Sequence, residues 1–337
     1  MSRKPIIADV ARLASVSTAT VDRVLNDRGG VKPEKEIKVL SAARRLKLDR
    51  ILTRRYSRVL RIAVLIQSSA NPFHAALRDA CAAASRAYAD LNLQFLIHHI
   101  DPGDASEIAA AIRRLGPRHN GLILTSPDDR RIAAAIGEVA QKIPVITLAT
   151  DLPGSGRWAY VGPDDRRAGR VAGDLMGRFL GREGGDIVMN AGLLSLVGQK
   201  ERDAGFRQVL GERYPACRIS AVFETRESAE RAGLAILEAL NENPAVRGVY
   251  HMTAGAPEAI AALRSQGRSK DVVVIAHELT EDRRALLKER AIDAVIDQNP
   301  EFEVRTATEL MARFLGRMEG VASTIITAVQ VYTSENV

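Results

Sequence analysis

From residue 60 onward, short apolar segments alternate with helical stretches, and this alternation constrains the fold more than any other feature of the chain. RIAVLIQ, LQFLIHH, GLILTS and IPVITLA read as buried strands, and GGDIVMN, GVYHMTA and DVVVIAHE repeat the pattern in a second set. Such alternation predicts doubly wound parallel sheets with helices on both faces. Two successive sets predict two lobes. Because ligands bind beyond the carboxyl ends of the strands in such sheets, we expect a ligand cleft between the lobes.

The positive charge of the chain is concentrated near its N-terminus. Residues 1–61 contain 16 lysines and arginines against 6 acidic residues, whereas the rest of the 337-residue chain contains 32 against 35. Charge that served only solubility would be spread over the whole surface. A short cationic segment on a mildly acidic body indicates a polyanion partner for that segment alone.

The cationic segment is predicted to form three helices. In IADVARLA the apolar residues have helical spacing. Ser17 is a good N-cap for a second helix, and Pro33 begins a third. Two short helices joined by a tight turn in basic surroundings fit a helix-turn-helix, whose second helix enters the major groove and needs small side chains near its N-terminus. An ordinary helical hairpin with a solvated face is the alternative.

The stretch IIADVARLASVSTATVDRVLN resembles the DNA-binding headpiece of the lac-repressor (LacI/GalR) family of bacterial regulators. By this resemblance, the base-reading positions are Thr18, Ala19 and Arg23, and the phosphate-contacting positions are Ser17, Thr20 and Asn26. Ser15 stands where the family usually has glycine in the turn. The resemblance therefore implies an all-α headpiece that binds double-stranded DNA.

A basic linker, LDRILTRRYSRVLRI, follows the headpiece, and its Arg54 and Arg55 are candidates for phosphate contacts. Members of the family usually have a hinge helix here with a leucine that enters the minor groove. No leucine falls clearly at that place, so a hinge helix and a flexible linker both remain open. The expected division is a headpiece at 1–48, a linker at 49–60 and a two-lobed body at 61–337. Within the body we expect lobe 1 at about 61–162 plus 298–323 and lobe 2 at about 163–297 plus a C-terminal strand.

The body resembles the periplasmic sugar-binding proteins, of type I fold, that the same regulators carry. The resemblance rests on the order of NPFHAAL, IPVITLATDLPGS, ERDAGF and IDAVIDQNP. Strand ends and this resemblance mark the candidate ligand residues, which are Asn71, Phe73, His74, Asp151, Arg202, Thr253, Glu278 and Gln298. Simpler structural roles stay open for three of them: Asn71 as a helix start, Asp151 as a loop cap and Arg202 in an ion pair.

These residue types suit a sugar or polyol. Carboxylates, amides and an arginine can each pair with two adjacent hydroxyls, and an aromatic ring can cover the apolar face of a sugar. The resemblance further implies that Arg202 binds ligand hydroxyls. We therefore expect a sugar or polyol effector in the cleft.

The sequence lacks the motifs that two alternative classes of protein would need. An α/β enzyme would need a phosphate loop, a nucleophile elbow or a metal cluster, and we find no motif for any of them. A transport binding protein would need a signal peptide, and the start MSRKPIIADVARLA contains no long apolar run. We therefore expect no enzymatic activity, no cofactor and no bound metal.

The sequence thus predicts a cytoplasmic, sequence-specific transcription regulator whose affinity for operator DNA is controlled by a ligand between the lobes. Because one headpiece covers only a few base pairs, we expect a homodimer on a palindromic operator, and a tetramer stays open. Repression and activation also both stay open. No membrane partner is expected, since no stretch approaches the roughly 20 apolar residues that span a bilayer.

Overall fold

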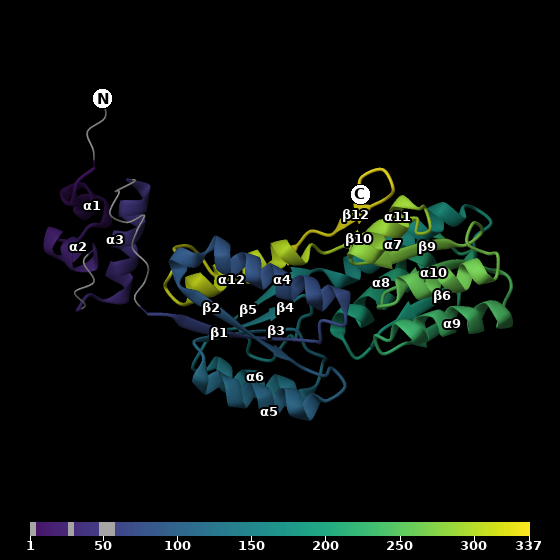
Figure 1. The fold of residues 1–337 in the computed structure, drawn as a ribbon, viewed down its shortest axis with the longest axis horizontal. Coiled ribbons are helices and arrows are strands. Elements are labelled where there is room, and N and C mark those ends of the chain that lie inside the picture. The colour runs from purple at the N-terminus through teal and green to yellow at the C-terminus, as the bar shows by residue number, and fades with distance from the viewer. Residues whose placement is uncertain (1–4, 26–29, 47–57) are drawn as a thin grey trace.

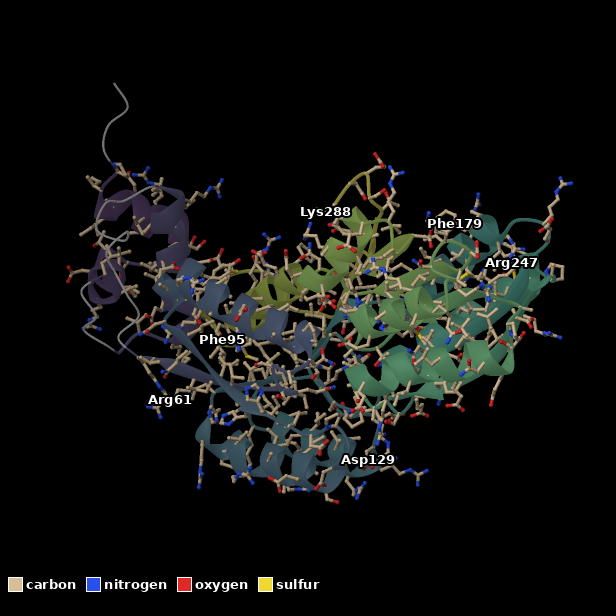
Figure 2. All side chains as sticks on the ribbon, turned by 45° about the vertical axis from the view of Figure 1, so that its right-hand side comes forward. Arg61, Phe95, Asp129, Phe179, Arg247 and Lys288 are labelled. Atoms are coloured by element: carbon tan, nitrogen blue, oxygen red, sulfur yellow. The ribbon has the colours of Figure 1, made fainter. Side chains whose placement is uncertain are left out.

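A computed structural model describes residues 5–25, 30–46 and 58–337. Three short helices near the N-terminus lie beside one end of a body made of two α/β lobes, and the second lobe lies at the far end (Figure 1). Figure 2 shows Arg61 at the headpiece side of the first lobe and Phe179 and Arg247 far from it on the second. Within those ranges, no helix combines the length and hydropathy of a bilayer-spanning segment.

The headpiece helices are α1 (Ile7–Ala14), α2 (Thr18–Leu25) and α3 (Pro33–Arg45). Their shared core contains Val10, Val21, Val24 and Val39, of which the helical spacing predicts the first three. Ser15 ends α1 in the left-handed conformation, with φ of 54°. That conformation favours glycine, the residue usual in this turn, because a Cβ there costs about 1–2 kcal/mol. The predicted three-helix headpiece is confirmed.

Lobe 1 is built on a six-stranded parallel sheet in the order β11-β5-β4-β3-β1-β2. Its strands are β1 (Leu60–Ile66), β2 (Leu93–His99), β3 (Gly121–Leu124), β4 (Val145–Leu148), β5 (Ala159–Pro163) and β11 (Ile325–Thr327). Its helices are α4 (Pro72–Ala87), α5 (Ala105–Leu115), α6 (Arg130–Ala140) and α12 (Pro300–Phe314). Helices α4 and α12 cover one face of the sheet and α5 and α6 cover the other (Figure 1).

Lobe 2 repeats this plan with the strand order β12-β10-β9-β8-β6-β7, in which only the β10–β12 pair is antiparallel. Its strands are β6 (Gly185–Ala191), β7 (Cys217–Glu224), β8 (Val246–His251), β9 (Val273–His277), β10 (Ala294–Asp297) and β12 (Gln330–Tyr332). Its helices are α7 (Asp165–Leu180), α8 (Val197–Arg213), α9 (Ala229–Glu242), α10 (Ala256–Ser265) and α11 (Glu281–Lys288). The prediction of two doubly wound lobes is confirmed.

The chain passes between the lobes three times, after β5, after β10 and between β11 and β12. The third passage lies a few residues later than the sequence suggests, because β11 still pairs with β5 of lobe 1. Three strands, β5, β7 and β11, are absent from the sequence prediction. Strand β7 lies at the edge of its sheet and alternates between exposed and covered residues, so it lacks the apolar run of a buried strand.

Helices α7 and α8 pack unusually closely through glycines. A Cβ on Gly169 would lie 2.0 Å from the carbonyl oxygen of Arg202, and a Cβ on Gly205 would lie 2.0 Å from that of Arg166. Gly173 faces Val209 in the same way, at 2.4 Å. Such distances leave no space for a side chain. The contact fixes the position of α8, which carries Arg202.

We predict that Gly205→Ala lowers the free energy of unfolding by about 1–3 kcal/mol, because the added methyl group must push the two helix backbones apart. Gly211→Ala on the same helix is the control. No atom lies within 4 Å of its added Cβ, so it should be neutral or stabilise by up to about 1 kcal/mol. Urea unfolding measures both variants. Equal stability of the two variants would contradict the close packing.

Candidate functional site

A cavity lies between the lobes at the carboxyl ends of their strands, and its empty volume is about 690 Å³ when open solvent is included. Lobe 1 lines it with Gln67, Asn71, Pro72, Phe73, His74, Thr125, Ala149 and Thr150. Lobe 2 lines it with Leu196, Gly198, Gln199, Arg202, Glu227, Met252, Thr253, Ala254, Glu278 and Arg283, and Gln298 lies at the second passage between the lobes. Both lobes thus supply polar side chains to one space.

Seven of the eight ligand residues proposed from the sequence line this cavity, and they are Asn71, Phe73, His74, Arg202, Thr253, Glu278 and Gln298. The eighth, Asp151, does not. Its carboxylate pairs with the guanidinium of Arg157 and accepts hydrogen bonds from Thr147 Oγ1 at 3.0 Å and Leu152 N at 2.7 Å. Ala149 is left-handed, with φ of 61°, and turns the chain so that Thr150 lines the cavity instead. At this strand end Thr150, and not Asp151, lines the cavity.

The lobe 1 wall combines a polar amide with two rings. Asn71 caps α4 by accepting a hydrogen bond from Phe73 N at 3.0 Å, and its amide nitrogen donates across the cleft to Glu227 Oε2 at 3.2 Å. Burial, assisted by His99, lowers the pKa of His74 to about 3, so its ring is neutral near pH 7. Its Nδ1 accepts from Gln67 N at 3.3 Å, and Phe73 meets its ring edge-on at 5.4 Å. This wall can both bond a hydroxyl and cover an apolar face.

The lobe 2 wall is organised around buried Arg202. Its Nε donates to Asp165 Oδ1 at 2.7 Å and its Nη1 donates to Glu278 Oε1 at 2.9 Å. Gln298 Nε2 donates to both oxygens of Glu278 at 3.0 Å. Burial raises the pKa of Asp165 to about 6, although Arg202 opposes the rise. Arg202 therefore lines the cavity and also forms a structural ion pair, and its binding of ligand hydroxyls stays a prediction.

Several residues that line the cavity are not predicted from the sequence. Glu227 and Gln199 bond each other, with Gln199 Nε2 donating to Glu227 Oε1 at 2.8 Å. Arg283 is buried, donates to the Thr253 carbonyl and donates from Nη1 to Thr280 Oγ1 at 3.0 Å. Glu227 follows β7, the edge strand that lacks an apolar run. No strand end could therefore be placed there from the sequence.

Backbone strain gathers at the same edge of the sheets. Eight non-glycine residues in the described ranges have φ between 52° and 65°, and five of them follow strands at the cleft: Ala149, Arg226, Glu227, Glu278 and Asn299. Non-glycine residues adopt this conformation rarely and at a cost. Strained residues cluster at ligand sites because the surrounding structure must hold side chains in fixed positions.

The second candidate site is the exposed face of the headpiece. Thr18, Ala19 and Arg23 are all exposed on α2. Thr20 N donates to Ser17 Oγ at 3.1 Å, which is the predicted cap of α2, and the two hydroxyl oxygens lie 2.9 Å apart. A shallow hollow beside them is lined by Ala11, Arg12, Ser15, Val16, Ser17, Thr18, Thr20 and Lys35. Asn26, Arg54 and Arg55 lie outside the described residues.

The described ranges contain no group of three histidine, cysteine or acidic side chains arranged to hold a metal ion. Cys81 and Cys217 are both buried and free. The geometry of the two sites therefore rests on hydrogen bonds, ion pairs and ring faces.

Comparison with known proteins identifies both parts of the chain. Residues 62–318 match the periplasmic binding protein domain, and residues 6–48 match the bacterial regulatory proteins of the lacI family. The ribose import binding protein RbsB of Salmonella typhimurium is 26% identical over 71% of this chain and 79% of its own length. The HTH-type transcriptional regulator DegA of Bacillus subtilis is 27% identical over 67% of both chains.

A solved structure shows the same fold for the body. The solute-binding protein of an ABC transporter from Burkholderia graminis, in complex with D-arabinose, aligns with a TM-score of 0.77 at 22% identity. The alignment covers 84% of this chain and 98% of that one. The chain therefore belongs to the periplasmic binding protein domain family, and ahead of that domain it carries a DNA-binding domain of the lacI family of bacterial regulatory proteins.

Proposed function

We propose that this protein is a cytoplasmic transcription regulator whose affinity for operator DNA is controlled by a sugar or polyol bound between the lobes. The observation that carries the proposal is the joining, in one chain, of an exposed helix-turn-helix face and a polar cavity between two lobes. The enzyme and transport alternatives would leave the headpiece without a role.

The cavity supports a sugar or polyol by its chemistry. Carboxylates, amides and hydroxyls line it, and each can pair with the donor and acceptor sites of adjacent hydroxyls. Phe73 offers a ring face for the apolar side of a sugar. RbsB is named for ribose, and the Burkholderia protein holds D-arabinose. D-ribose and D-arabinose are therefore the first probes to test.

On the DNA side, Thr18, Ala19 and Arg23 are the proposed base readers, and Ser17, Thr20, Asn26, Arg54 and Arg55 are the proposed phosphate contacts. A recognition helix reads only a few base pairs, so specific affinity needs two headpieces on a palindrome. A two-fold homodimer supplies them with matching symmetry.

Closure of the cleft offers a route from ligand to DNA. Two lobes that the chain connects by three passages can rotate about those passages, which moves lobe 2 relative to lobe 1. Helix α12 begins just after Gln298 at the cavity and runs along lobe 1 toward the headpiece (Figure 1). Beyond its end, Arg317 Nη2 donates to the Arg58 carbonyl at 2.9 Å, where the chain enters lobe 1. In a dimer, this movement would change the spacing of the two headpieces.

We predict that Arg23→Ala weakens binding to the cognate operator by about 1–3 kcal/mol and relaxes specificity at one base position. Arg55→Ala should weaken all sequences alike and reduce the salt dependence of binding, because it removes a phosphate contact. Binding of both variants to specific and random duplexes at several salt concentrations measures this. Equal losses on the two duplexes for Arg23→Ala would contradict its role in base reading.

We predict that Asn71→Ser weakens binding of D-ribose or D-arabinose at least about 10-fold, because serine keeps the cap of α4 but does not reach into the cleft. Asp151→Ala is the control, since Asp151 bonds Arg157 outside the cavity. Calorimetry on both variants gives the affinities, and thermal unfolding reports the fold. A large loss in Asp151→Ala with none in Asn71→Ser would place the ligand elsewhere.

A further inference from the structure

Glu227 joins the two walls of the cavity. Its Oε2 accepts from Asn71 Nδ2 of lobe 1 at 3.2 Å, and from Thr253 Oγ1 at 3.4 Å and Ala254 N at 3.2 Å in lobe 2. Its Oε1 accepts from Gln199 Nε2 at 2.8 Å. Asn71 and Thr253 are themselves candidate ligand residues. The Glu227 carboxylate therefore lies where a ligand would meet both lobes.

The surrounding chain is shaped to hold this carboxylate. A Cβ on residue 192 would lie 1.7 Å from Glu227 Oε1, so only glycine leaves the space. Gln199 Oε1 accepts from Gly192 N at 2.7 Å and from Leu193 N at 3.1 Å, which directs Gln199 Nε2 at Glu227. Arg226 and Glu227 are both left-handed, with φ of 54° and 60°. Two strained residues in a row indicate that the position of Glu227 serves the site and not merely the fold.

The charged groups around the cavity carry no net positive charge that would attract an anionic ligand. Arg202 is already bonded to two carboxylates, those of Asp165 and Glu278. Arg283 is the remaining cation of the wall, and Glu227 is the remaining carboxylate. These groups amount to two guanidinium ions against three carboxylates. The wall is therefore balanced or negative before a ligand enters.

Glu227 also has capacity for one more donor. A carboxylate oxygen can accept two hydrogen bonds, and Oε1 accepts one from the described residues. Burial raises the pKa of Glu227, while the bonds from Gln199 and Ala254 favour its ionised form. A ligand hydroxyl or ammonium group that donates to Oε1 would compensate the carboxylate for the loss of water.

We propose that Glu227 is a specificity-determining residue, which accepts a hydrogen bond from a hydroxyl or ammonium group of the effector and excludes sugar acids and sugar phosphates by its charge. This inference rests on the proposed function, in which the effector binds between the lobes. The cleft then takes neutral polyols and amino sugars.

Matched sets of probes test the proposal. D-glucose, D-glucosamine and D-glucuronate form one set, the corresponding D-galactose compounds form a second, and D-ribose with ribose 5-phosphate forms a third. Glu227→Gln keeps the size of the side chain and removes its charge. Glu224→Gln is the control, because Glu224 is exposed at the end of β7 and does not line the cavity.

In the wild type and in Glu224→Gln, the neutral or amino member of a set should bind about 100-fold more tightly than the acid or phosphate, because like charges repel in the cleft. In Glu227→Gln this ratio should fall at least about 10-fold. An acid or phosphate that binds the wild type more tightly than its neutral counterpart would overturn the proposal. An unchanged ratio in Glu227→Gln would do the same.

Inorganic phosphate gives a test that needs no sugar. Glu227→Ala empties the carboxylate position and leaves the donors of Asn71, Gln199 and Ala254 in a cavity that Arg283 also lines. Phosphate should therefore raise its melting temperature at concentrations at least about 10-fold below those that affect the wild type or Glu224→Ala. Equal phosphate responses would overturn the role of Glu227. If no sugar of any set binds the wild type, the proposed effector class fails separately, and the phosphate comparison still decides the role of Glu227.

Discussion

The buried pairing of Arg202 with Asp165 and Glu278 is the interaction on which the cleft depends. Asp165 begins α7 directly after the first passage between the lobes, Arg202 lies on α8, and Glu278 follows β9. The Arg202 guanidinium group thus connects α7 and α8 to the residue that follows β9. Gln298 joins the second passage between the lobes to the same Glu278. Breaking such a pair would leave buried charges uncompensated, at a cost of about 3–5 kcal/mol.

The packing of α7 on α8 allows this pairing. Glycines bring the two helix backbones close enough for Arg202 to reach Asp165 with its Nε. A second buried acid, Glu303 on α12, lies near the same pairing and accepts from Thr327 Oγ1 at 3.4 Å. Burial, with the nearby charges of Glu278 and Asp165, raises the pKa of Glu303 well above its ordinary value. Three carboxyl groups, those of Asp165, Glu278 and Glu303, thus lie around Arg202, and their mutual repulsion together with burial favours the protonated form of Glu303.

How far the sequence predicts the molecule depends on whether local pattern or tertiary packing decides a feature. The sequence predicts apolar strands such as β1 and β3 and the headpiece helices around Val10 and Val21. Their buried residues form a continuous run or repeat at a fixed period. Strand β7 is not predicted, because as an edge strand its residues alternate in exposure.

The residues of the cavity also differ in whether a local sequence pattern predicts them. Asn71 and Gln298 follow recognisable strands and are placed correctly in the cavity. Asp151 does not line the cavity, whereas its neighbour Thr150 does. The cause is the left-handed conformation of Ala149, which no local sequence pattern predicts. Glu227 and Arg283 are missed because their positions depend on strained backbone and on contacts between elements distant in the sequence.

We propose that ligand binding and operator binding are coupled through the three connections between the lobes. The most direct test is calorimetric titration of the tightest-binding neutral sugar into the full-length protein, with and without saturating operator DNA. Because coupling free energies are reciprocal, operator must change the sugar Kd by the same factor as sugar changes the operator Kd, typically about 5–150-fold. We predict such a matched pair of shifts in the two Kd values. Identical sugar Kd values with and without operator would contradict it.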